Sequence, residues 1–462
     1  MTPPRRLSEF GALSVAEMRL IDEMGSGLTV AIGDGEVPPA DAGPDRTIRA
    51  DLIRHLLLGT DDELHAGGRR LHEKGIKIIG ARISGVLDLQ SCTVSCDIAL
   101  AKCRFDETPV LVSARLQNLA LNGSVLPGLH ADFVECRGGV TMDSVEVAGE
   151  VRFVGADIGG KLDFDNARIS NPGGNALLVN RAITGGVFFL RGTARIEGLL
   201  NMTDAHFRTM ADAVACWPSP GELNLNRLTY DAFIMDAPVA AEARIKWLAL
   251  QNPRRFSADF WPQPYEQCGS VLREMGDVGG AQLILIEKEK LQRKAQRDRA
   301  APAIRPLLWL RDTVLSVTIR YGHRPILAVL WLIGFWLLGT IVFAGLYQAS
   351  AFMPNSITVF RSAEWTGCAN PAVASIALPG ESQLNCFLRQ PEAQSYPRFV
   401  APIYALDALV PIIDLDVQSF WRPDETKPWG EAGQAYLWFQ VVVGWALSFL
   451  AVAGFSGLVK SR

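Results

Sequence analysis

Three carboxylates near the end of the chain, Asp407, Asp414 and Asp416, have the residue type and spacing best suited to a chemical role. They lie in Tyr404–Asp416, an apolar stretch that directly precedes a long apolar run whose most polar residue is Gln440. Carboxylates at the mouth of a channel attract cations. The pattern predicts Asp407, Asp414, Asp416 and Gln440 as candidate pore-lining residues. The alternative is an amphipathic helix that lies on the outer leaflet or packs on the spans, because the sequence has no glycine-rich filter.

One segment is similar to a phosphate-binding loop. Gly155–Lys161 ends in Gly-Gly-Lys, but a P-loop needs Ser or Thr after the lysine to hold magnesium, and Leu162 stands there. Gly25–Gly27 and Gly33–Gly35 lack the third glycine of a dinucleotide-binding fingerprint. We therefore predict no cofactor-binding residue.

Cys92, Cys96 and Cys103 are close enough in sequence to suggest a metal cluster. However, Ala81, Cys92, Cys103 and Ala114 follow one another at intervals of 11 residues, so two of the cysteines occupy a small-residue position of a repeat. The six histidines show no His-Glu-x-x-His or other ligand spacing. The sequence also has no nucleophile elbow and no kinase signature. We predict neither metal-binding nor catalytic residues.

The composition indicates a folded protein. The 462 residues include 45 basic and 49 acidic side chains, for a formal net charge of −4, and 48% are hydrophobic. A disordered chain would have fewer apolar residues and a larger net charge. Nothing in this charge balance favours nucleic acid as a partner.

Two uncharged apolar runs predict transmembrane helices at 326–347 and 435–459. Each is long enough to cross the roughly 30 Å hydrocarbon core of a bilayer. Between Lys288 and Arg324 there are ten basic and three acidic residues (10 − 3 = +7), whereas the loop 348–434 has five basic and nine acidic residues (5 − 9 = −4). The positive-inside rule then places both termini in the cytoplasm and the loop outside.

Cys368 and Cys386 are the only cysteines of this loop. An oxidising compartment favours disulfides, so we predict that these two form one. The other six cysteines fall on the reducing side.

The first half of the chain contains a short repeat. Gly80–Leu89 matches Gly155–Phe164 almost position by position, and apolar residues recur every 11 positions from Ile83 to Leu116 and from Val147 to Ile169. The spacing loosens afterwards. A fixed short period with alternating apolar residues and corner glycines is typical of a β-helix, or pentapeptide-like solenoid. Two segments per coil would give about six coils over 76–207.

Helical patterns are expected on both sides of the repeat, at Val15–Met24, Thr47–Gly59, Val239–Gln251, Pro264–Met275 and Ala281–Arg297, and Pro306–Ile319 reads as an interfacial helix. The predicted fold is a mixed β and α membrane protein. Its parts are an N-terminal helical cap (1–75), a β-helix repeat domain (76–210), a helical neck (211–300), a juxtamembrane interfacial helix (301–325), transmembrane helix 1 (326–347), an extracytoplasmic loop (348–434) and transmembrane helix 2 (435–459).

Several motifs are spread over nearly the full length: Ile48–Arg54 with Leu56–Gly59, Gly80–Leu89, Pro262–Gln267, Tyr321–Pro325 and Leu406–Leu415. In these the chain resembles a family of bacterial membrane-associated proteins with pentapeptide-like repeats and two C-terminal transmembrane helices. The resemblance implies a multi-pass protein of the bacterial plasma (inner) membrane. Members are often labelled membrane-associated oxidoreductases, but this chain has no flavin or nicotinamide loop, no haem or iron–sulfur cysteine spacing and no Cys-x-x-Cys pair.

The sequence therefore favours a membrane-tethered, self-associating scaffold or sensor over an enzyme. Its expected partners are the lipid bilayer, further copies of itself and a protein bound on a β-helix face. An oligomeric two-span pore gated by the cytoplasmic domain is the first alternative, and an oxidoreductase, from the family label alone, is the second.

Overall fold

The computed structural model describes residues 6–59, 70–369 and 376–456 of the chain. The chain divides into two compact units, Met1–Ala295 and Gln296–Arg462, with the boundary inside one helix, α6 (Val278–Arg299). The first unit is a β-solenoid of about 7 turns with helices at both ends. The second unit is helical and contains both long apolar helices.

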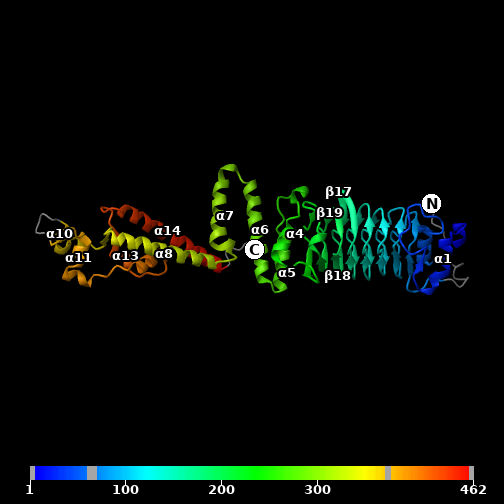
Figure 1. The fold of residues 1–462 in the computed structure, drawn as a ribbon, viewed down its shortest axis with the longest axis horizontal. Coiled ribbons are helices and arrows are strands. Elements are labelled where there is room, and N and C mark those ends of the chain that lie inside the picture. The colour runs from blue at the N-terminus through cyan, green and yellow to red at the C-terminus, as the bar shows by residue number, and fades with distance from the viewer. Residues whose placement is uncertain (1–5, 60–69, 370–375, 457–462) are drawn as a thin grey trace. The chain divides into compact units, whose positions relative to one another are not determined.

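Two parallel sheets form the solenoid, whose coils are stacked along its length (Figure 1). The first sheet contains β1 (Val30–Ala31), β3 (Ile76–Ile79), β5 (Ile98–Ala101), β7 (Arg115–Leu116), β8 (Leu119–Ala120), β11 (Glu135–Cys136), β12 (Val140–Thr141), β15 (Asp157–Ile158), β16 (Leu162–Asp163), β18 (Ile183–Leu190), β20 (His206–Asp212) and β22 (Thr229–Phe233). The second contains β2 (Thr47–Arg49), β4 (Arg82–Ser84), β6 (Arg104–Phe105), β9 (Val125–Leu126), β10 (Leu129–His130), β13 (Glu146–Val147), β14 (Val151–Arg152), β17 (Arg168–Leu178), β19 (Arg195–Asn201) and β21 (Leu223–Asn224).

The strand register confirms that two 11-residue segments make one coil. Ile76 pairs with Ile98, Ile98 with Leu119, and Leu119 with Val140, so each coil takes 22 or 21 residues. The step from Leu162 to Phe188 is longer, at 26 residues. This explains the looser spacing of the sequence repeat there. Parallel pairing also extends from Val30 to Phe233, so the solenoid recruits strands from the 1–75 and 211–300 regions that the sequence assigns to cap and neck.

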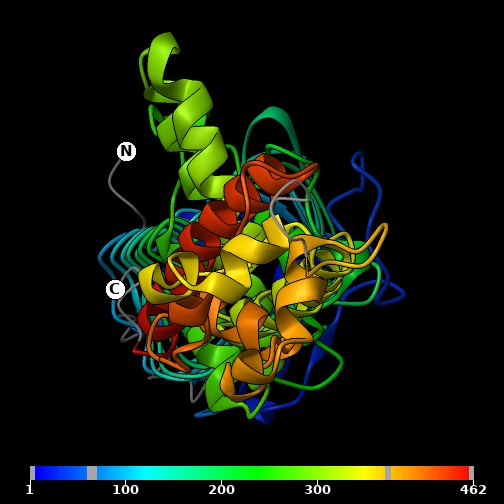
Figure 2. The same ribbon diagram turned by 90° about the vertical axis from the view of Figure 1, so that its left-hand side faces the viewer.

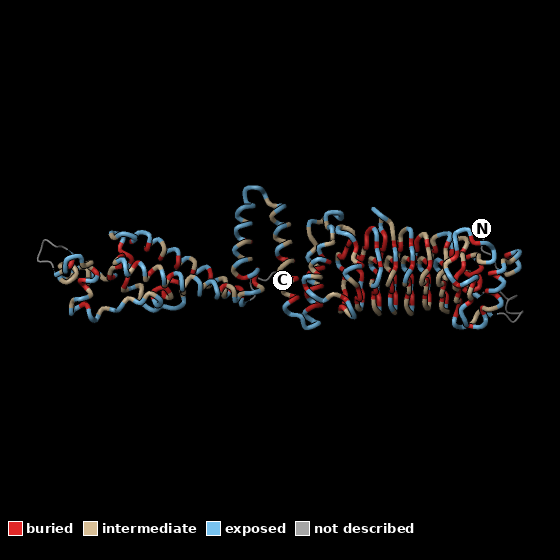
Figure 3. The backbone as a smooth tube through the Cα atoms, in the orientation of Figure 1, coloured by how far each residue is buried: buried red, intermediate tan, exposed pale blue. Residues whose placement is uncertain are grey.

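The core is a stack of inward-facing apolar side chains. One ladder of paired, buried positions runs through seven consecutive coils: Ile76, Ile98, Leu119, Val140, Leu162, Phe188 and Met210. Figure 3 shows buried positions recurring along the coils. Since each coil covers the apolar face of the next, the repeats are stable only as a stack.

Glycines form some of the expected corners, such as Gly159 and Gly160, but another set of corners carries mostly other residues. Residues with left-handed backbone recur about every 11 positions, and most carry side chains, including Ser91 (φ 57°), Lys102 (φ 47°) and Ser113 (φ 55°), with a glycine at Gly155 (φ 66°). A non-glycine residue in this region is strained by roughly 1–2 kcal/mol. The stacked ladder must therefore hold the corners in place.

Helices cover both ends of the solenoid. At the N-terminal end lie α1 (Val15–Glu23) and α2 (Ala50–Leu58), and α2 ends at Gly59 in left-handed conformation. At the other end, α4 (Ala241–Leu248) and α5 (Gln263–Glu274) follow the last strand, β22. The side-chain amides of Gln263 and Gln267 donate hydrogen bonds to the carbonyls of Leu228 and Tyr230. This capping covers a strand edge that would otherwise pair with other chains.

The second unit is built on α8 (Ile326–Gln348) and α14 (Gly430–Phe455), which lie side by side in Figure 1 and Figure 2. Both are long and apolar enough to cross a membrane. They begin and end within a few residues of the predicted spans, although 457–459 lie outside the described residues. α7 (Arg305–Ile319) precedes α8 and exposes Leu307, Trp309 and Leu310.

The segment between α8 and α14 has its own short elements. These are β23 (Phe352–Pro354), α9 (Ile357–Phe360), α10 (Ala363–Ala369), α11 (Gln383–Leu388), α12 (Ala401–Leu409), α13 (Val417–Phe420) and β24 (Trp421–Pro423). Single-turn 3-10 helices complete the described chain at Leu7–Phe10, Met24–Ser26, Val214–Cys216, Pro253–Phe256, Pro302–Ile304, Arg320–Gly322 and Pro391–Ser395.

Candidate functional site

The segment that carries the three carboxylates folds back against both apolar helices. α12 contacts α8 and α14. The indole Nε1 of Trp336, in α8, donates a hydrogen bond of 2.9 Å to the carbonyl of Pro402. Nε2 of Gln440, in α14, donates one of 2.9 Å to the carbonyl of Ala405. One polar side chain from each long helix therefore holds the backbone of α12.

Glycines make room for this packing. A Cβ at Gly339, in α8, would lie 2.4 Å from the amide nitrogen and oxygen of Gln440. Gly444, in α14, lies directly against the carbonyl of Leu409 at the end of α12. Small residues allow helices in such bundles to approach closely. Gly339 thus lets α8 approach Gln440 of α14, and Gly444 lets the end of α12 approach α14.

Asp407 closes the turn that follows α12. Its carboxylate accepts hydrogen bonds from the backbone N–H groups of Leu415 (2.8 Å), Val417 (3.0 Å) and Gln418 (3.0 Å). The N–H groups at the start of α13 have no partner within that helix, so the carboxylate satisfies them. Asp407 is buried. It fixes the return of the chain through Val410–Asp416, which we call the tip.

Asp414 and Asp416 are both exposed, within the tip. Oδ1 of Asp414 accepts the N–H of Asp416 at 3.0 Å, and Oδ1 of Asp416 accepts the hydroxyl of Ser419 at 2.5 Å. These bonds shape the turn, and both residues remain exposed.

The four candidate pore-lining residues therefore fall into two pairs. Asp407 and Gln440 are buried and hold α12 and the tip in place. Asp414 and Asp416 lie together on the exposed tip. The packing of α12 on the two apolar helices corresponds to the alternative that the sequence left open, while the lining of a pore stays a prediction.

An aromatic cluster that the sequence did not predict anchors the N-terminal end of α12. The rings of Tyr347 and Phe399 stack with centroids 4.6 Å apart, and Tyr404 and Trp421 pack against the same group. Trp421 is fully buried, and its indole N–H donates to the carbonyl of Pro397 at 2.9 Å. The many aromatic residues between 347 and 436 were the feature of the sequence that could have predicted this cluster.

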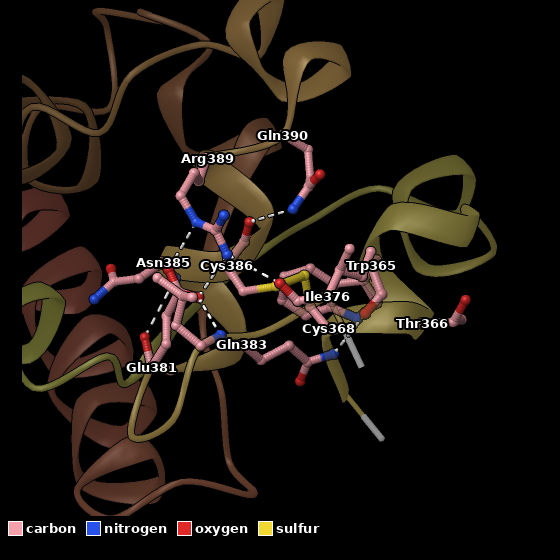
Figure 4. The surroundings of a disulfide bond; sticks show 12 residues. Trp365, Thr366, Cys368, Ile376, Glu381, Gln383, Asn385, Cys386, Arg389 and Gln390 are labelled. Atoms are coloured by element: carbon pink, nitrogen blue, oxygen red, sulfur yellow. Dashed lines mark hydrogen bonds and ion pairs between the residues drawn. A yellow bond between two sulfur atoms is a disulfide. The ribbon is translucent and has the colours of Figure 1, made fainter. Parts of the chain in front are cut away.

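The structure pairs Cys368 with Cys386 in a disulfide that joins α10 to α11 (Figure 4). Around it, the amide of Gln383 donates to the carbonyl of Trp365 at 3.1 Å. Arg389 donates to both carboxylate oxygens of Glu381, at 3.1 and 2.9 Å. This hydrogen bonding lowers the pKa of Glu381.

A cavity of about 700 Å³ lies beside the disulfide. Its charged lining residues are Glu381, Asp424 and Lys427. Glu381 is paired with Arg389, and Oδ1 of Asp424 accepts the N–H and the hydroxyl of Thr426. The two carboxylates are thus already engaged in local structure.

The segment similar to a P-loop forms part of a coil. Asp157–Ile158 is strand β15, and Gly159 and Gly160 form a corner stacked against the preceding coil. The ammonium group of Lys161 lies 2.8 Å from the carboxylate of Asp163. No helix follows, so no N-terminal amides point at a phosphate.

The cysteines of the first unit pack as small apolar residues. Cys103 is fully buried at the repeat position expected from the sequence, and burial raises its pKa to about 12. Burial likewise raises the pKa of Cys136 to about 11. Within the described ranges, no three His, Cys, Asp or Glu side chains are grouped so that they could hold a metal ion.

The most prominent buried charges lie at the C-terminal end of the solenoid. The guanidinium of Arg244 donates two hydrogen bonds to the carboxylate of Asp212, at 2.8 and 2.7 Å. It lies 3.5 Å from the ring centroid of Phe233, and Trp217 donates its indole N–H to the same carboxylate at 2.6 Å. Both charges are buried. We therefore assign the pair a structural role, which is to hold α4 against β20.

The fold and the site define a β-solenoid protein with two helices of membrane-spanning length and a short helix packed against both of them. Comparisons of the chain with protein-family models, curated proteins and solved structures find no match. The resemblance to the pentapeptide-like repeat family therefore stays a prediction.

Proposed function

We propose that this protein is a membrane-tethered scaffold or sensor whose β-solenoid binds a protein partner in the cytoplasm. The observation that carries the proposal is the apolar surface of the second unit. Large apolar side chains are exposed all along α8 and α14, among them Ile341 (71% exposed), Phe449 (73%) and Val452 (60%). Exposed apolar surface of this extent favours a lipid environment.

The solenoid suits a scaffold because it presents long, regular faces. Outward positions on consecutive strands carry polar side chains, as in the pair Arg115 and Glu135, whose charged atoms are 3.0 Å apart. Helices cover both ends, so the faces remain for binding. A stacked repeat of this kind offers an extended surface for a protein partner.

Two measurements test the membrane tether and its orientation. The full chain should remain in the membrane pellet after extraction with alkaline carbonate, and release into the supernatant would contradict the tether. In intact cells, an impermeant maleimide should label Glu392→Cys in the loop and leave Glu135→Cys on the solenoid unlabelled. Both residues are exposed, so labelling of Glu135→Cys from outside would refute the orientation. The wild-type chain supplies the background from its own thiols.

The exposed carboxylates of Asp414 and Asp416 favour a second candidate function, a cation-conducting pore assembled from several copies. Two long helices enclose no aqueous path, so a pore needs more chains. We expect a ring of four or more copies in detergent and cation flux in liposomes, weakened in Asp414→Asn/Asp416→Asn. A monomer or simple dimer would exclude the pore and leave the tether intact.

A further inference from the structure

The depth of the tip follows from which residues of α12 and α14 are in contact. Ala405 contacts Gln440, and Leu409 contacts Gly444, so the two helices run in the same direction. Gly444 is 14 residues from the start of α14 at Gly430, which corresponds to about 21 Å at a rise of 1.5 Å per residue. The full 26 residues span about 39 Å. The tip therefore begins beyond the midpoint of α14.

At that depth the tip is exposed from Ile412 to Asp416. Val410–Asp416 is irregular backbone, Ile412 is 80% exposed, and Asp414 and Asp416 are exposed as well. In a bilayer, irregular backbone and carboxylates within the hydrocarbon layer do not face lipid, but are buried in protein or line water. Within a single chain, the described residues neither bury the exposed part of the tip nor enclose water beside it.

We propose that a second copy of this chain covers the tip, with Asp414 and Asp416 facing water enclosed between copies. The inference rests on the proposed membrane tether. Symmetric assembly about an axis normal to the membrane places every tip at the same depth, so tip meets tip without a second kind of chain. The apolar residues Ile412, Ile413 and Leu415 would supply the contact. Repulsion between the carboxylates would favour enclosed water over direct packing.

Cysteine cross-linking of the full chain in membranes tests this arrangement. Ile412→Cys should give a covalent dimer with a short bismaleimide, because its side chain is exposed and the substitution disturbs no packing. Val442→Cys is the matched control. It is 66% exposed on α14 at a similar depth, and we expect little cross-linking there.

Each outcome decides the proposal. A dimer at least fivefold more abundant from Ile412→Cys than from Val442→Cys supports it, as does reaction of Ile412→Cys with a small charged thiol reagent. Cross-linking of Ile412→Cys to a protein of different mass would overturn it, and so would a dimer from Val442→Cys alone or no dimer. If carbonate extraction keeps the chain in the membrane while no dimer forms, this inference fails and the membrane tether stands.

Discussion

The carbonyl oxygen of Leu409 lies so close to Gly444 that a Cβ at that glycine would be 1.8 Å from it. Because real side-chain atoms do not approach this closely, Gly444→Ala must displace α12 from α14. Such overpacking costs about 1–3 kcal/mol. We expect a lower midpoint of thermal unfolding in detergent and faster proteolysis of the segment between α8 and α14.

Gly334→Ala is the matched control for this substitution. Gly334 also lies within a long apolar helix, but a Cβ there meets no atom within 4 Å. We expect unchanged stability, because alanine favours helix at least as well as glycine does. Equal losses in both variants would mean that the Gly444 contact does not hold α12.

The buried pair of Arg244 and Asp212 should dominate the stability of the C-terminal end of the solenoid. Arg244→Met removes the guanidinium and leaves the carboxylate of Asp212 buried with only the indole N–H of Trp217. Removing one partner of a buried pair costs about 3–5 kcal/mol. Hydrogen exchange of β20, β22 and α4 in the full chain measures the loss.

The double variant Arg244→Met/Asp212→Asn should recover part of that loss. The neutral amide oxygen still accepts the hydrogen bond from Trp217, and no unpaired charge remains buried. A double variant less stable than Arg244→Met would show that the carboxylate stabilises this end of the solenoid without its partner.

Glu17 should make the N-terminal end of the solenoid sensitive to acid. Burial raises the pKa of its carboxyl, but hydrogen bonds from Arg49 and from the N–H of Ser14 outweigh burial and lower it below the ordinary 4.5. The stabilisation is thus complete above pH 4.5 and is lost as the pH falls through the lowered value. Hydrogen exchange of α1 and α2 should accelerate in that acidic range.

Glu17→Gln checks the assignment. It should weaken protection of α1 at neutral pH, because the ionic bonds of 2.7 Å to Nε and Nη2 of Arg49 are lost. In this variant, the remaining protection of α1 from hydrogen exchange should depend less on pH below pH 4.5. An unchanged acid profile in the variant would assign the sensitivity to other carboxyls.

The disulfide between Cys368 and Cys386 should stabilise the segment between α8 and α14. Cys368→Ser/Cys386→Ser should destabilise this segment by roughly 3 kcal/mol, since the bond closes a loop of 18 residues in the unfolded chain. The readout is the rate of proteolysis between α8 and α14. Equal rates in wild-type and variant would mean that the bond is absent or unimportant.

Thiol labelling of the native protein adds an independent measurement. Cys92 and Cys96 are half-buried and should react first, whereas Cys103, Cys136, Cys216 and Cys268 should react only on unfolding. Burial raises the pKa of Cys268 to about 11, which lowers its reactive thiolate fraction further. Rapid reaction of six thiols without denaturant would contradict the packing of the solenoid.

Local patterns in the sequence predicted the solenoid and the long helices. The 11-residue spacing is a property of each segment, and the uncharged runs at 326–347 and 435–459 extend over the length of a helix. The left-handed corners were harder to foresee. Ser91 and Lys102 adopt this conformation because neighbouring coils fix their backbone, which no local preference predicts.

The carboxylate site was only partly predictable. The residue types in Tyr404–Asp416 indicated a short apolar helix with acids, as observed in α12 and the tip. Which acids are buried depends on contacts between residues far apart in the chain. Asp407 is buried because α13 turns its N–H groups toward it, and Gln440 because Ala405 lies across from it.

By itself, the sequence determined the period of the coils, the two apolar helices and the two cysteines of the loop, because each depends on residue type and spacing alone. Tertiary structure decided that Gly339 admits Gln440 and Gly444 admits the end of α12, and that Asp414 and Asp416 remain exposed while Asp407 does not. The physical reason is steric. Close approach and burial arise from the packing of distant segments, which periodicity along one segment does not encode.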